Sequence, residues 1–159
     1  MEKSQILALI DGERARLDAA LGHLSRERMA APGAEGGWSV KDILAHITWS
    51  ERELTGVLRQ RAMVGSDLWN LSQDERNAAV YAENRDRTLD DVLAAWQGDF
   101  AALRAEIARL SDAELADPAL IAEIPGGLAL WQLLAGGTWL HYAEHLPAIQ
   151  AHGVQPDLG

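Results

Sequence analysis

The chain of 159 residues contains no cysteine, and this absence excludes disulfide bonds, thiolate metal ligands and a cysteine nucleophile. Any metal ion must therefore be held by nitrogen and oxygen atoms. A thiol that takes part in the chemistry would have to arrive as a cosubstrate.

Basic residues are scarce: 14 Lys and Arg residues stand against 24 Asp and Glu residues, and the formal net charge is −10. Such a chain offers little to neutralise phosphate groups and is repelled by anionic membrane surfaces. We therefore expect a small-molecule substrate or ligand as the partner, and neither nucleic acid nor membrane.

Long apolar runs are also missing, since no segment approaches the roughly 18 apolar residues of a membrane-spanning helix. The first residues, MEKSQILALIDGERARL, lack both the uninterrupted apolar segment and the small-residue cleavage site of a signal peptide. These observations predict a soluble, cytoplasmic protein.

Strand-like alternation is nearly absent, whereas helical periodicity is strong, so we predict an all-α fold. With 48% hydrophobic residues the chain can bury one core, which favours a single domain over residues 1–159. Four long amphipathic helices are expected, at about residues 4–24, 40–58, 89–110 and 130–149. They predict a four-helix bundle with a long crossover between the second and third helices.

The crossover is expected to hold a connection over residues 63–73 and a short polar helix with Asn77 and Tyr81. In the fourth helix, Gly136 and Gly137 would allow a close helix crossing. Pro147 lacks an N–H group, and we expect a bend there, just after His145.

Three histidines form the candidate functional site. His141 and His145 are spaced i, i+4 and share one helical face, while His46 lies on the flank of the second helix. Three imidazoles would leave a divalent metal with open positions, as in catalytic sites. However, chance gives about 0.15 such pairs for 5 histidines in 159 residues, and a half-exposed helical histidine is the ordinary alternative.

Residues near these histidines in sequence or by helical spacing are candidates for a pocket and for hydrogen bonds to the ligands. Each candidate has an ordinary alternative as a core, capping or surface residue. For the pocket we predict aromatic and polar side chains: Trp49, Asn77, Tyr81, Trp131 and Thr138. For hydrogen bonds to the ligating imidazoles we predict acceptors: Asp42, Thr138 and Glu144.

Other catalytic motifs are missing. The sequence has no Gly-rich phosphate loop, no dinucleotide fingerprint, no nucleophile elbow and no Glu-x-x-His pair of the di-iron bundles. One mononuclear metal site is therefore the most elaborate chemistry that the residues support.

Several segments together resemble one family. Residues 37–46, GWSVKDILAH, resemble the opening of the second helix in DinB-like (DinB/YfiT-like) four-helix bundle proteins, and residues 141–145, HYAEH, resemble their paired histidines. The resemblance spans nearly the whole chain. Further segments are similar to the ClbS/DfsB-type branch: residues 77–81, 85–88, 111–115 and 130–138.

The resemblance implies a bundle, often dimeric, in which His46, His141 and His145 bind nickel, zinc or a similar ion. Members include transferases and isomerases that use a low-molecular-weight thiol such as mycothiol or bacillithiol. The ClbS/DfsB-type branch also includes a self-resistance protein that opens the cyclopropane ring of a DNA-alkylating genotoxin.

Three functions stay open at this point. The first is a metal-dependent transferase, isomerase or hydrolase in which an activated thiol or water attacks an electrophilic small molecule. The second is metal-independent ring opening of a genotoxin, with Asn77, Tyr81 and tryptophans shaping the pocket. The third is a non-enzymatic binding or stress-response protein.

Overall fold

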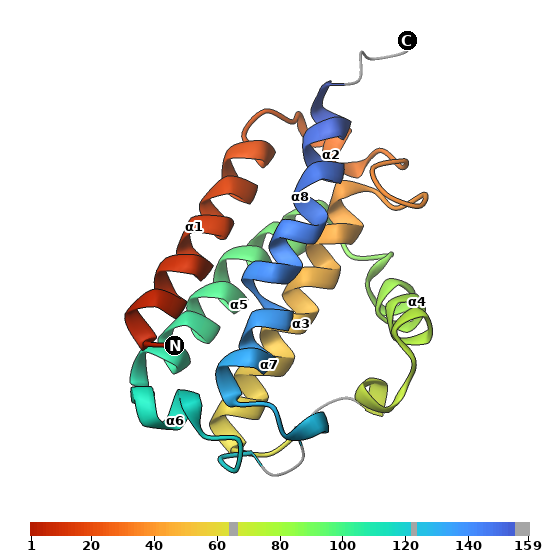
Figure 1. Ribbon diagram of the computed structural model, residues 1–159. Helices are drawn as coiled ribbons and strands as arrows, with labels where there is room; N and C mark the ends of the chain where they lie inside the picture. Colours follow the sequence, from red (N-terminus) through yellow and green to blue (C-terminus); the bar gives the residue numbers. More distant parts are fainter. Residues whose placement is uncertain (64–66, 122–123, 155–159) are drawn as a thin grey trace.

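The computed structural model describes residues 1–63, 67–121 and 124–154, and within these ranges the protein is all-helical without a β-strand (Figure 1). The all-α prediction is thereby confirmed. In the same ranges, no helix combines the length and the apolar character that crossing a membrane requires.

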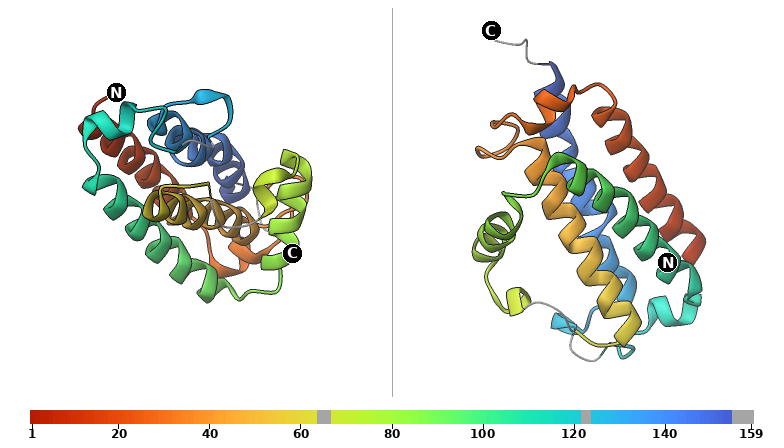
Figure 2. Two further views of the ribbon diagram at one scale, coloured as in Figure 1. Left: turned by 90° about the horizontal axis from the view of Figure 1, so that it is seen from below. Right: turned by 180° about the vertical axis from the view of Figure 1, so that it is seen from behind.

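The helices follow one another along the chain as α1 (Lys3–Leu21), α2 (Arg26–Ala30), α3 (Val40–Gln60), η1 (Asp67–Asn70), α4 (Gln73–Asn84), α5 (Leu89–Arg109), α6 (Asp112–Ala116), η2 (Pro125–Gly127), α7 (Leu130–Gly137) and α8 (Trp139–Val154). α3 packs along α5, and α1 packs along α8 (Figures 1 and 2). α4 lies outside these long helices and packs against α3. α3 also contacts α7 and α8, so it lies at the centre of the molecule.

The described residues form more helices than the four that periodicity predicts. The predicted helix over residues 130–149 is in fact two helices, α7 and α8, which meet at Thr138 (φ −131°, ψ −107°). Two preceding glycines, Gly136 and Gly137, weaken helix formation at this point, and the Thr138 hydroxyl donates to the Leu134 carbonyl at 2.6 Å. The helix is interrupted at Thr138 and not at Pro147, where a bend was expected, since α8 continues through Pro147.

Side-chain caps explain where α3 begins. Ser39 accepts a hydrogen bond from the Asp42 N–H, and the Asp42 carboxylate in turn accepts from the Ser39 N–H at 2.9 Å and from its hydroxyl at 2.6 Å. This reciprocal capping box satisfies amide groups that have no partner inside the helix. Ser72 with Glu75 and Ser111 with Glu114 cap α4 and α6 in the same way.

The central position of α3 determines which of its polar residues become buried. α3 is covered by α5, α4, α7 and α8, so its apolar stripe and also its flanks are removed from water. His46 is 8% exposed and Glu51 is 0% exposed. Buried polar groups require partners, and both residues therefore need polar or cationic neighbours from other helices.

Gly137 allows α7 to approach α3 closely. A Cβ atom at Gly137 would lie 2.5 Å from Leu54 Cδ1 and 3.1 Å from Ser50 Oγ, whereas a Cβ at Gly136 would meet nothing within 4 Å. Leu54 is 1% exposed and has little room to move.

We therefore expect Gly137→Ala to lower the free energy of unfolding by about 1–3 kcal/mol, the usual penalty for overpacking a core. Gly136→Ala is the matched control and should leave stability unchanged or raise it, because alanine favours the helix. Denaturant unfolding of the two variants tests this. Equal stabilities would show that α3 and α7 separate at no penalty.

Candidate metal centre

His46, His141 and His145, hereafter the triad, meet between α3 and α8. One nitrogen from each ring lies within 4.8 Å of the others. His46 Nε2 and His141 Nε2 are 2.8 Å apart, and the ring centroids of His141 and His145 are 4.9 Å apart. The triad can therefore hold a divalent metal ion through imidazole nitrogens.

Two contacts between α3 and the α7/α8 segment set the register that brings the triad together. The Ser50 hydroxyl donates to the Gly137 carbonyl at 3.4 Å, and the Tyr142 hydroxyl donates to Glu51 at 2.5 Å. With α8 fixed in this way, the i, i+4 spacing of His141 and His145 places both rings on the side that faces His46.

The electrostatics of the site favour neutral imidazoles at His46 and His141. Burial lowers the pKa of His46 to about 4, and the positive charges of His145 and Arg76 contribute to the same shift. Burial likewise lowers the pKa of His141 well below its ordinary value. At neutral pH these rings therefore carry lone pairs rather than charges.

These features fit a metal ion. Two facing Nε2 atoms at 2.8 Å need a proton on one of them or a cation between them, because two lone pairs repel each other. Neutral imidazole is a common ligand of zinc and nickel. The Nδ1 atoms of His46 and His141 are buried and have no hydrogen-bond partner in the described part of the chain, so no protein group there fixes which nitrogen of either ring carries the proton.

The Glu35 carboxylate is hydrogen-bonded to the third ring of the triad, that of His145. Glu35 Oε2 lies 2.8 Å from His145 Nδ1, so an Nδ1–H group can donate to it and leave Nε2 free for an ion. Glu35 belongs to a tight turn that is closed by contacts with Trp38 and that needs positive φ at Gly36 (54°) and Gly37 (91°). Glu35 could not be predicted from sequence spacing, because the turn is 110 residues away from His145 along the chain.

A cavity of about 300 Å³ opens beside the triad, and all three histidines line it. Two residues predicted for the pocket, Trp49 and Asn77, are among its walls. Three further wall residues, which were not predicted, come from η1 and α4, namely Trp69, Gln73 and Arg76. A cavity of this size accommodates a small organic molecule.

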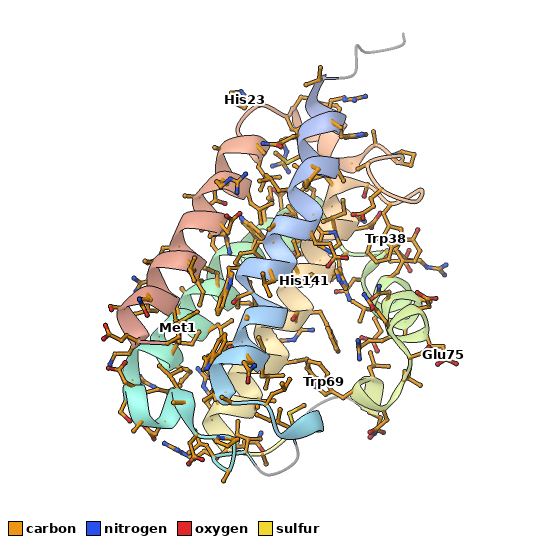
Figure 3. The ribbon with its side chains drawn as sticks, in the orientation of Figure 1. Met1, His23, Trp38, Trp69, Glu75 and His141 are labelled. Atoms are coloured by element: carbon orange, nitrogen blue, oxygen red, sulfur yellow. The ribbon has the colours of Figure 1, made fainter. Side chains whose placement is uncertain are left out.

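Trp49 and Trp69 form an aromatic wall of this cavity. Their rings are 5.4 Å apart at an interplanar angle of 42°, and Figure 3 shows Trp69 on the same side of the bundle as His141 and α4. The Arg76 guanidinium lies 5.6 Å from the Trp69 ring, within the range of a cation–π contact. No periodic pattern marks Trp69, because it lies in the connection between α3 and α4.

Three residues predicted for the pocket lie elsewhere in the structure. Tyr81 stacks on Trp38, with ring centroids 5.6 Å apart, and Trp38 in turn meets the edge of His46 at 5.5 Å. Trp131 packs against the hydrophobic core, and Thr138 is fully buried at the junction of α7 and α8. None of the three is among the cavity walls formed by the described residues.

The predicted acceptors for the imidazoles also have other positions. The Asp42 carboxylate is occupied by the capping box at the start of α3. The Thr138 hydroxyl donates to the Leu134 carbonyl. Glu144 is exposed and lines the cavity without a hydrogen bond to a histidine in the described residues. Glu35 takes the role for which these three were candidates.

Comparison with known proteins agrees with the fold. The sequence profile of the DinB superfamily matches residues 9–147, and the chain therefore belongs to the DinB superfamily. The crystal structure of an uncharacterised protein from Escherichia coli UTI89 is similar, with a TM-score of 0.76 and 12% sequence identity; the match covers 94% of this chain and 91% of that one. At this identity the likeness shows a shared fold. A search of the curated proteins gives no match.

Proposed function

We propose that this DinB-superfamily protein is a mononuclear metal-dependent enzyme that acts on an electrophilic small molecule. The observation that carries the proposal is the convergence of three imidazole nitrogens within 4.8 Å at the wall of a cavity of about 300 Å³. A closed structural site would have no such cavity beside it.

In this proposal His46, His141 and His145 hold the ion. When bound, the ion would supply Lewis acidity and lower the pKa of a coordinated water or thiol. Glu35 accepts a hydrogen bond from the His145 Nδ1–H and fixes the orientation of that ring. Trp49 and Trp69 cover one side of the cavity and would pack against an apolar part of the substrate.

The finer features of the proposal come from chemistry and from the family resemblance. Three imidazoles favour zinc or nickel as the ion. Because the chain has no cysteine, a thiol nucleophile would be a low-molecular-weight cosubstrate, which makes a thiol-dependent transferase or isomerase the leading reaction class and a hydrolase the second. A homodimer, a cytoplasmic location and membership of the ClbS/DfsB-type branch are further parts of this proposal.

The metal-independent alternative has less support. Ring opening of a genotoxin would use Tyr81 in the pocket, whereas Tyr81 stacks on Trp38 and is not among the cavity walls in the described residues. A binding protein without activity would use the same cavity, and only turnover distinguishes it from the enzyme.

Metal analysis tests the proposal most directly. The protein, purified without a metal-binding tag, reconstituted with zinc or nickel and then dialysed, is expected to retain about one ion per chain in mass spectrometric metal analysis. Chelation should remove the ion. It should also abolish the activity in which a low-molecular-weight thiol displaces the halide of a reactive aryl halide. Failure to retain any ion would contradict the proposal, and full activity after chelation would favour the metal-independent alternative.

A further inference from the structure

We propose that Arg76 binds a carboxylate group of the substrate, so that the cavity takes a small molecule with one carboxylate and an apolar part. This inference rests on the proposed function in one respect, namely that the cavity beside the triad is the substrate site. It adds the chemical class of that substrate.

Arg76 is an unusual arginine in this protein. The chain carries a formal net charge of −10, and most arginines of the described residues pair with carboxylates, as Arg61 does with Glu114 at 2.6 Å and Arg104 with Asp11 at 2.7 Å. Arg76, by contrast, has no carboxylate oxygen of the described residues within 4.0 Å of its guanidinium nitrogens. It lines the cavity beside the Trp69 ring instead.

Further hydrogen-bond donors surround Arg76. Gln73, Arg76 and Asn77 are spaced i, i+3 and i+4 on α4, so they share the face that lines the cavity. Trp69 Nε1 is buried and has no hydrogen-bond partner in the described residues. A buried indole N–H normally has an acceptor, so Trp69 Nε1 is available to donate to a ligand.

The charge balance favours a carboxylate over a phosphate. One guanidinium compensates one negative charge, and the other donors near it are neutral. A phosphate monoester carries a charge of roughly −1.5 to −2, so in the metal-free protein Arg76 would leave part of this charge uncompensated in a cavity that Glu144 also lines. The planar fork of a guanidinium also matches the two oxygens of a carboxylate.

Arg76 is close enough to the triad to act on the same molecule. Arg76 and all three histidines line the same cavity. A substrate anchored at Arg76 would place its apolar part against Trp49 and Trp69 and its reactive carbon towards the triad. In this proposal Arg76 anchors the substrate and the triad acts on its reactive carbon.

Binding of simple probes to chelator-treated protein tests the inference without metal. We expect benzoate to bind and to quench the fluorescence of Trp49 and Trp69, and its neutral isostere benzamide to bind at least about tenfold more weakly. Arg76→Gln should weaken benzoate binding about tenfold or more and leave benzamide binding unchanged. Arg76→Lys should fall in between, since lysine keeps the charge and loses the fork.

Arg16→Gln is the matched control, because it removes the same charge from an exposed position on α1 that pairs with Glu13. It should bind benzoate as the unmodified protein does. Equal binding of benzoate to Arg76→Gln and to the unmodified protein would overturn the inference, as would equal or absent binding of benzoate and benzamide. Tighter binding of phenyl phosphate than of benzoate would overturn the carboxylate assignment. Because no ion takes part, these outcomes are independent of metal retention.

Discussion

Replacement of His141 by alanine is expected to reduce zinc or nickel affinity by more than the roughly 10–100-fold that loss of a hydrogen-bond partner of a metal ligand causes. The variant would keep two imidazoles and place a methyl group in the remaining position. After dialysis the retained metal should fall from about one ion per chain towards zero, and activity should fall with it. His46→Ala and His145→Ala should behave in the same way.

Two further variants make the experiment specific. His23 is exposed and lies far from the triad, near the end of α1 (Figure 3), so His23→Ala should retain the ion. Glu35→Gln keeps the three ligands and weakens the hydrogen bond to His145 Nδ1, so its metal affinity should decrease by only about 10–100-fold.

A thermodynamic measurement complements metal analysis. An ion that binds only the folded state raises the free energy of unfolding by about 2.7 kcal/mol at a concentration one hundred times its dissociation constant. The unmodified protein and His23→Ala should show this gain, and the three triad variants should not. Retention of a full complement of metal by all three alanine variants would show that the ion binds elsewhere.

Much of the fold could be predicted because helical periodicity is a local signal. The stripe of Val40, Ile43, Leu44 and Ile47 predicts α3, and its capping box predicts where it begins. The interruption at Thr138 could not be predicted in the same way. Weak helix propensity at Gly136 and Gly137 permits a break there, but the close approach to Leu54 that requires small residues is a tertiary contact.

In the candidate site, too, local sequence patterns predict some residues, and tertiary contacts place the others. The triad was predicted because its residues lie on long helices and resemble a family motif. Glu35, Trp69 and Arg76 lie in a turn, a connection and the polar helix α4, where no apolar periodicity marks which side chains face inward. Their roles depend on the tertiary packing of these segments against α3 and α8, which sequence spacing does not specify.

For Tyr142 the sequence predicts the direction of the side chain but not its hydrogen-bond partner. As the neighbour of His141 it points about 100° away around the helix, and this places it away from the triad. The structure shows its target: the Tyr142 hydroxyl is fully buried and donates to Glu51, which Arg14 also approaches at 3.4 Å. Arg14 in turn lies over the Trp96 ring at 3.4 Å and donates to the Trp96 carbonyl.

This buried polar cluster leads to a second large effect, on stability. Glu51 is 0% exposed, and its Oε2 atom has no hydrogen-bond partner in the described residues. Burial raises the pKa of Glu51 to about 7, although Tyr142 and Arg14 favour the charged form. The folded protein therefore holds a proton on Glu51 more tightly than the unfolded chain, in which the pKa is 4.5.

The pH dependence follows from this difference. A group whose pKa is higher in the folded state contributes most to stability below its unfolded pKa, and the contribution is lost as the pH rises through the folded pKa. For Glu51 the loss falls between about pH 4.5 and pH 7 and amounts to about 3 kcal/mol. The low pKa of His46 has the opposite effect, since stability is lost as the pH falls from 6.5 to about 4.

Glu51→Gln isolates the carboxyl contribution, because both proteins share the histidines. Glutamine cannot ionise, so the free energy of unfolding of Glu51→Gln should rise relative to that of the unmodified protein by about 3 kcal/mol between pH 4.5 and pH 8. Denaturant unfolding of the metal-free proteins across this range measures the difference. Glu83→Gln, at an exposed position on α4, should show no such trend. A difference between Glu51→Gln and the unmodified protein that does not change with pH would mean that Tyr142 and Arg14 keep Glu51 ionised throughout, and that the cluster is a permanent ion pair.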